Sequence, residues 1–190
     1  MVATTMAYTD FLSTYVDGLI TQLQTLKAEG IKPQRFFAID CEKLADSSAA
    51  ELRESIEFKP IFEDLKKAPV LYWFEIISLT DRKSIRTALE TYKDSTSPRA
   101  TPALRVVSDQ PTDVLYVGKV KSSFPNRLLQ HLGYFGVPAT QGLQLRHWAR
   151  DLDLQLTLNV IEFEAGMAEL MAVLEYALAK ELRPLIGKHK

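Results

Sequence analysis

The chain has 190 residues, of which 46% are hydrophobic and 25% are charged, and this composition excludes disordered, collagen-like and disulfide-rich proteins. Its 23 basic and 24 acidic side chains give a net charge of -1, which argues against a protein that coats nucleic acid over its whole surface. At about 150 residues per domain, the length predicts one main domain, with room for an appendage.

The N-terminal third of the chain is predicted to be mostly helical. Ser48 and Glu51 form a capping box, and Gly30 follows a long stretch of apolar residues at helical spacing. The predicted helices cover residues 8–29, 48–58 and 60–67, and residues 36–39 are a short extended piece. We therefore expect residues 1–68 to be a helical segment, for which specificity, dimerisation and regulation remain open as roles. Homo-oligomer formation through these helices is one such expectation.

The rest of the chain alternates strands and helices. Either Thr80 or Asp81 caps the first of these helices. The predicted strands cover residues 70–78, 113–120 and 153–160, with a short extended piece at 104–107, and the predicted helices cover 81–92, 125–133 and 167–182. This order predicts an α/β (α+β) fold with a small three-stranded, mainly antiparallel sheet flanked by helices.

Several common enzyme classes are excluded because their motifs are missing. The chain contains no HExxH, GxxxxGK[ST], GxGxxG or GxSxG motif. Its three histidines are scattered, and Cys41 is the single cysteine, so no CxxC metal site or internal disulfide can form. No stretch approaches the roughly 20 apolar residues that cross a bilayer. We expect a cytoplasmic protein without membrane contact.

One group of residues indicates chemistry. Tyr116 lies on a predicted strand and is followed closely by Gly118. Arg127 and His131 are four residues apart, which puts both side chains on one face of a helix. Glu175 lies on the last helix among apolar neighbours, so its carboxylate either faces a cleft or is poorly placed for solvent.

This combination resembles the GIY-YIG nuclease family. Val70-Leu71-Tyr72 stands for the first motif and Tyr116-Val117-Gly118 for the second. Arg127 and His131 stand for the third motif, and Glu175 with the later Leu-Arg-Pro stands for the fourth. The resemblance covers residues 69–190, and it implies that the residues near 80–110 are an insertion between the first two motifs.

The resemblance implies a metal-dependent endonuclease that hydrolyses phosphodiester bonds in DNA. Glu175 would bind Mg²⁺ or Mn²⁺, and Arg127 would hold the phosphate and stabilise the charge of the transition state. Tyr72 and Tyr116 would position or deprotonate the attacking water, and His131 would assist proton transfer.

The distribution of charge agrees with a DNA partner. Between residues 114 and 150 there are five basic side chains and no acidic one, although the whole chain has a net charge of -1. A basic stretch that holds two of the motifs suits a phosphate-bearing partner. The substrate-binding residues expected here are Gly118, Lys119, Lys121 and Arg146.

Two departures from the family pattern leave alternatives open. Val70 occupies the position of the first motif's glycine, and Gly187 occupies the position of an asparagine that follows the fourth motif. The first alternative is therefore a catalytically inactive GIY-YIG-like domain that binds nucleic acid or a protein partner. The second is a protein-interaction module that assembles through the N-terminal helix.

Overall fold

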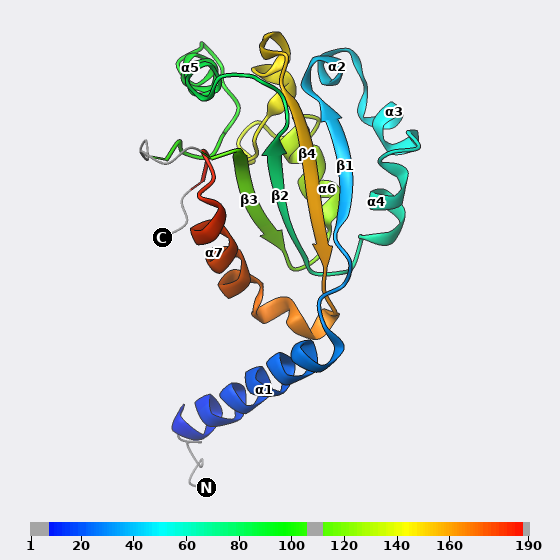
Figure 1. Cartoon of the computed structure of the whole chain (residues 1–190), viewed down its shortest axis with the longest axis vertical. Helices are drawn as coiled ribbons and strands as arrows, with labels where there is room; N and C mark the ends of the chain where they lie inside the picture. The colour runs from blue at the N-terminus through cyan, green and yellow to red at the C-terminus, as the bar shows by residue number, and fades with distance from the viewer. Residues whose placement is uncertain (1–7, 106–111, 188–190) are drawn as a thin grey trace, which may run out of the picture. The chain divides into compact units, whose positions relative to one another are not determined.

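An antiparallel sheet of four strands organises the larger part of the molecule (Figure 1). The strands are β1 (Arg35–Asp40), β2 (Val70–Ile76), β3 (Val114–Val120) and β4 (Gln155–Glu162), in the spatial order β1-β4-β2-β3. The expectation of three strands was wrong. The short piece expected near residues 36–39 pairs with β4 along its whole length, because Phe37 and Ile39 bury their side chains on one face.

The computed structural model describes residues 8–105 and 112–187, and it divides the chain into two units, Met1–Pro33 and Gln34–Lys190. The smaller unit holds one helix, α1 (Tyr8–Glu29), which confirms the predicted helix. Gly30 follows it in a left-handed conformation, with a φ of 81°, and donates its N–H to the carbonyl of Leu26. The expected part of α1 in homo-oligomer formation stays a prediction.

The two faces of the sheet are covered by different helices. Tyr72 and Phe74 of β2 face the main core, where α6 (Phe124–Leu132) packs. Trp73 and Val117 face the other way and pack against α7 (Met171–Leu182). Figure 1 shows α6 behind the sheet and α7 beside β3. Alternate residues of β2 and β3 therefore serve two separate apolar layers.

Short helices fill the segments between the strands. Ser48 and Glu51 form the predicted capping box at the start of α3, which ends earlier than expected because Ser55 is already extended. The helix expected from residue 167 begins as a 3-10 turn. The short helices between the strands are α2 (Cys41–Asp46), α3 (Ala49–Glu54), α4 (Lys59–Asp64) and the 3-10 helices η1 (Leu145–His147), η2 (Arg150–Leu152) and η3 (Ala165–Glu169).

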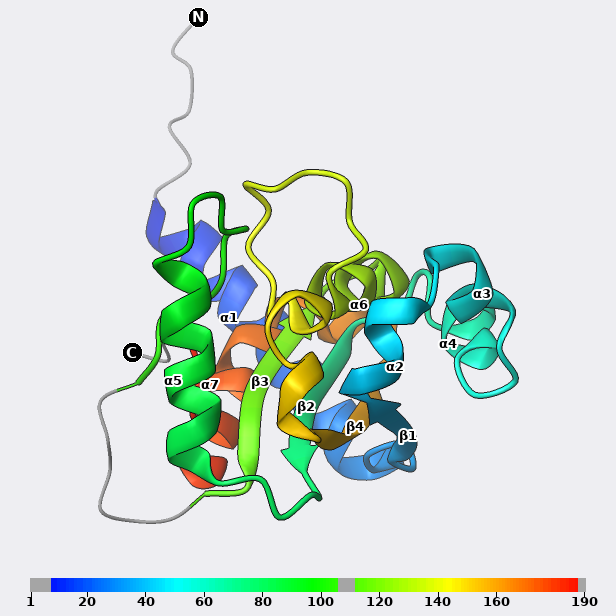
Figure 2. The same ribbon diagram turned by 90° about the horizontal axis from the view of Figure 1, so that it is seen from above.

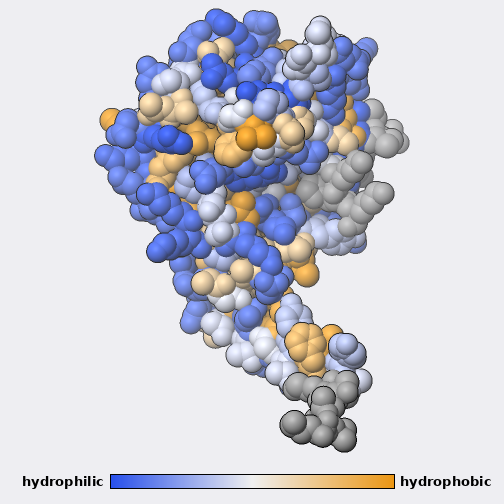
Figure 3. All heavy atoms as spheres, turned by 180° about the vertical axis from the view of Figure 1, so that it is seen from behind, coloured by the Kyte–Doolittle hydropathy of each residue, from blue (hydrophilic) through white to orange (hydrophobic). Residues whose placement is uncertain are grey.

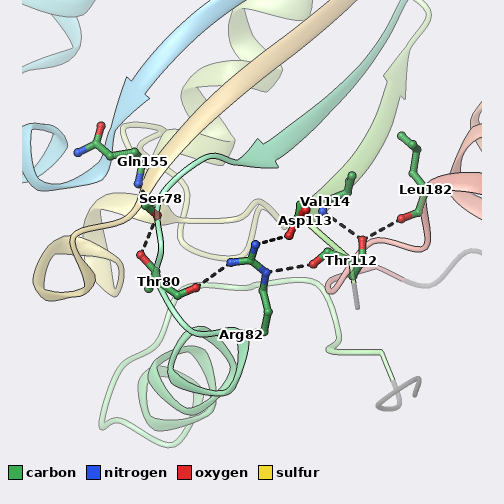
Figure 4. A network of polar contacts seen from close by, with 8 residues as sticks. All are labelled: Ser78, Thr80, Arg82, Thr112, Asp113, Val114, Gln155 and Leu182. Atoms are coloured by element: carbon green, nitrogen blue, oxygen red, sulfur yellow. Dashed lines mark hydrogen bonds and ion pairs between the residues drawn. The ribbon is translucent and has the colours of Figure 1, made fainter. Parts of the chain in front are cut away.

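The connection between β2 and β3 begins with α5 (Arg82–Lys93), whose first turn is capped by Asp81. The guanidinium of Arg82 donates hydrogen bonds to the carbonyls of Thr80 and Thr112, at 2.7 and 3.0 Å, and pairs with the carboxylate of Asp113 (Figure 4). This network ties the start of α5 to the end of β2 and the start of β3. The extended piece expected at residues 104–107 lies partly outside the described residues, and Leu104 forms a bridge with Ile186.

Figure 3 shows one face of the molecule, which is mainly polar. From behind, hydrophilic side chains cover most of the face, with apolar ones in separate patches (Figure 3). Within residues 8–105 and 112–187, no helix has both the length and the apolar character needed to cross a bilayer.

Candidate functional site

Tyr72 and Tyr116 lie on neighbouring strands, where a glycine makes room for Tyr72. Tyr72 of β2 pairs directly with Gly118 of β3, and Phe74 pairs with Tyr116. A Cβ atom added to Gly118 would lie 2.5 Å from the hydroxyl of Tyr72 and 2.7 Å from a ring atom of Tyr116. Gly118 is therefore required by packing, because a side chain there would meet the buried side chain of Tyr72.

Arg127 joins the two tyrosines. It lies on α6, and its guanidinium donates hydrogen bonds to the hydroxyls of Tyr72, at 3.2 Å, and Tyr116, at 3.4 Å. The same group donates to the side chain of Gln130, at 2.9 Å, and to the carbonyl of Gln141, at 2.6 Å. All its partners are neutral, so the guanidinium is held in place while its charge is not cancelled.

His131 lies one turn further along α6 and is fully buried. Its Nδ1 atom accepts a hydrogen bond from the backbone N–H of Leu143, so the ring proton is assigned to Nε2. Nε2 lies 2.8 Å from the hydroxyl of Tyr72 and donates to it. Burial lowers the pKa of His131 well below its ordinary value, and the charge of Arg127 lowers it further. His131 is therefore neutral near pH 7 and orients Tyr72, which leaves it no exposed nitrogen for proton transfer to solvent.

The hydroxyl of Tyr72 accepts two hydrogen bonds, but the phenol stays protonated. Burial raises the pKa of Tyr72 far above its ordinary value, and Tyr116 raises it further while Arg127 opposes the shift. Burial also raises the pKa of Tyr116, again against the effect of Arg127. The two tyrosines are therefore suited to hold other groups by hydrogen bonding, and they are poor bases at neutral pH.

Glu175 faces a cavity of about 800 Å³ that Tyr116 also lines. Its carboxylate is half-buried, and no cation among the described residues lies within ion-pair distance of it. Burial raises the pKa of Glu175, whereas the nearby charges of Lys119 and Arg127 lower it. Its partly desolvated carboxylate gains stability from a cation that enters the cavity.

The other residues expected to bind substrate have different positions. Lys119 is half-buried beside Glu175 and acts on its pKa. Lys121 is exposed and pairs with Glu169 at 2.7 Å, which offsets its charge. Arg146 donates a hydrogen bond to the carbonyl of Ala45 and lies over the ring of Tyr134, at 4.7 Å from its centre. The structure therefore brings Lys119 to the site, whereas Lys121 and Arg146 have structural partners of their own.

Several residues that line the cavity had no signal in the sequence. Gln141 holds Arg127 through its carbonyl, and the segment 98–103 lines the cavity together with Lys93. The basic residue of this segment, Arg99, stands between Pro98 and Ala100 and matches no motif. Its closeness to the site depends on contacts between loops.

The comparisons with known proteins leave the site to be interpreted from its own geometry. No protein-family model, no curated protein and no solved structure matches this chain.

Replacing Gly118 by alanine tests the packing beneath Tyr72. The added methyl group would meet the hydroxyl of Tyr72 at 2.5 Å, and the Tyr72 side chain is fully buried. We expect a loss of about 1–3 kcal/mol in the free energy of unfolding, measured by urea denaturation. Gly136 is the matched control, because a Cβ there meets nothing within 4 Å. Equal stability of Gly118→Ala and Gly136→Ala would contradict the geometry.

The burial of His131 and its lowered pKa predict that the stability of the protein depends on pH. Its folded pKa lies well below its ordinary value of 6.5, so below about pH 6.5 the unfolded chain binds one more proton than the folded chain. Stability therefore falls as the pH is lowered from 7 to 5, by up to about 1.4 kcal/mol per pH unit from this group. In urea denaturation, His131→Gln should have a shallower pH dependence than the wild type. The control His147→Gln should change the slope less, because His147 is exposed. Identical slopes for the wild type and His131→Gln would rule out a buried neutral histidine.

Proposed function

We propose that residues 69–190 form a GIY-YIG-type endonuclease domain that hydrolyses phosphodiester bonds in DNA with a divalent metal. The observation that carries this proposal is the convergence of four motif side chains from four separate elements. Tyr72, Tyr116 and Arg127 share hydrogen bonds, and Glu175 faces the cavity that Tyr116 lines. Sequence distance alone gives no reason for these groups to meet.

The charges of the site suit a phosphodiester. Arg127 has neutral hydrogen-bond partners and therefore keeps its positive charge for an anion. Glu175 makes no ion pair among the described residues and therefore keeps its negative charge for a cation. A phosphate group that bridges these two charges, with a metal ion beside the carboxylate, would satisfy both.

Glu175 fits the role of a Mg²⁺ or Mn²⁺ ligand. It is a hard oxygen donor that is partly desolvated at the edge of a cavity, and burial disfavours its charged form in the absence of a cation. The described residues contain no cluster of three or more metal-binding side chains. A site with one carboxylate is compatible with Mg²⁺, which keeps several waters and shares substrate phosphates as ligands.

The protein's own contribution is orientation and charge. The chemistry that a bound divalent metal supplies is neutralisation of the phosphate and stabilisation of the leaving oxygen. Arg127 would hold a non-bridging oxygen of the phosphate and stabilise the charge that develops on it. Tyr116, at the cavity surface, would position the attacking water by hydrogen bonding, and buried Tyr72 would fix Arg127.

One observation favours the alternative of an inactive, nucleic-acid-binding domain. Gly187 lines the cavity at the position where the family has an asparagine, and its φ of 118° suits glycine. The cavity therefore lacks a polar side chain at this point. Under this alternative, the protein would bind DNA in a salt-sensitive manner and would not cleave it.

A plasmid-cleavage assay tests the proposed function. Wild-type protein with Mg²⁺ or Mn²⁺ should convert supercoiled plasmid to nicked or linear forms. Glu175→Gln and Arg127→Met should each lose about 100-fold or more of this activity, because each removes one of the charges that stabilise the transition state. EDTA should abolish cleavage by the wild type.

Glu181→Gln is the matched control, because Glu181 lies on the same helix and is exposed. It should retain activity within about twofold of the wild type. DNA binding without cleavage by the wild type would favour the inactive domain. Cleavage that persists in both Glu175→Gln and Arg127→Met would contradict the assignment of the site.

A further inference from the structure

The connection between β2 and β3 supplies one wall of the cavity. Besides Glu175 and Tyr116, the cavity is lined by Lys93, at the end of α5, and by the segment 98–103 that follows it. This segment carries a second basic side chain, Arg99. Two cations from outside the motifs therefore share a cavity of about 800 Å³ with two of the motif residues.

Backbone hydrogen bonds hold this wall in place from two sides. The N–H of Ala100 donates to the carbonyl of Pro138, and the N–H of Gly142 donates to the carbonyl of Ala100, at 3.0 and 3.1 Å. On the other side, the N–H of Gly187 donates to the carbonyl of Ala103 at 2.9 Å. Figure 2 shows the segment after α5 beside the loop that follows α6. Backbone contacts of the protein itself thus hold the wall in place.

Each of the two cations is oriented by a neutral carbonyl. The guanidinium of Arg99 donates to the carbonyl of Phe135 at 2.5 Å, and the ammonium of Lys93 donates to that of Pro102 at 2.8 Å. Neither forms an ion pair with a carboxylate of the described residues. Both side chains are half-buried, and burial lowers the pKa of Lys93. Carbonyl groups restrict these side chains without cancelling their charge, so a bound anion would gain more from them than from mobile surface lysines.

The cavity therefore has an excess of positive charge beyond what one phosphate needs. Arg127 is hydrogen-bonded to the cavity residue Gln141. Its positive charge and the negative charge of Glu175 would balance each other around a metal and one phosphate. Lys93 and Arg99 are left for a second anion. A nucleic-acid strand presents such an anion at every nucleotide, on either side of the bond that is cut.

We propose that Lys93 and Arg99 form a second phosphate subsite, which holds the phosphate next to the scissile one so that a nucleotide spans the cavity. This inference rests on the proposed function, and it specifies the feature of the substrate that the site recognises. That feature is a nucleoside with two phosphates. The connection between β2 and β3 thus positions the strand, whereas the motif residues act on the bond.

Binding of thymidine 3′,5′-bisphosphate, compared with thymidine 5′-monophosphate, tests the subsite without any need for cleavage. Isothermal titration calorimetry on the full chain should give at least about tenfold tighter binding of the bisphosphate, since a hydrogen-bonded charge pair is worth about that factor. Arg99→Met and Lys93→Met should each reduce this advantage to about threefold or less. Lys83→Met, on the exposed side of α5, should leave it unchanged.

Two variants are used because Arg99 also supports the carbonyl of Phe135, and circular dichroism checks that each one folds. Equal affinity of the wild type for the two nucleotides would overturn the subsite, and so would a full bisphosphate advantage in both folded variants. If the wild type shows no plasmid cleavage but its bisphosphate advantage depends on Lys93 and Arg99, the subsite stands and the nuclease proposal fails. If plasmid cleavage is normal but the wild type binds the bisphosphate no more tightly than the monophosphate, the nuclease proposal stands and the subsite fails.

Discussion

The buried hydroxyl of Tyr72 is the group on which the site and much of the core depend. A phenol enclosed among apolar side chains needs hydrogen-bond partners, because an unsatisfied buried polar group is costly. Arg127 and His131, one turn apart on α6, both donate to it. The ring of Phe124 packs against it at 4.9 Å between centres, and Gly118 leaves space across the strand pair. The contact that fixes α6 on the sheet therefore also places Arg127 beside Tyr116.

This arrangement keeps two opposite charges unpaired, with Glu175 in the wall of the cavity and Arg127 behind the lining residues Tyr116 and Gln141. Arg127 is held by two tyrosines and the carbonyl of Gln141, and Glu175 approaches from α7 on the other side of β3 without pairing with it. An Arg127–Glu175 ion pair would have satisfied both residues and closed the site to ligands. Because the pair does not form, each charge remains available, and the proposed metal and phosphate chemistry follows from that separation.

Strong local patterns in the sequence predicted the central strands, α1 and the capping box of α3. They did not predict β1 as part of the sheet, because its partner β4 lies about 120 residues away and its six residues carry little periodicity. The motif residues were found by their spacing on α6 and on β3. Lys93, Arg99 and Gln141 were missed. Backbone contacts between loops bring Arg99 and Gln141 to the cavity, and Lys93 reaches it from the end of α5 beside Pro102; such contacts have no sequence signature.

We propose that Tyr116, Arg127 and Glu175 form one site, which binds a divalent metal at the carboxylate of Glu175. Paramagnetic broadening of backbone amide NMR signals by Mn²⁺ tests it most directly. We expect the signals of β3 near Tyr116 and of α7 near Glu175 to broaden at the lowest Mn²⁺ concentrations, and we expect Glu175→Gln to remove this effect. Broadening centred on other acidic elements, such as α3, and unchanged in Glu175→Gln would contradict it.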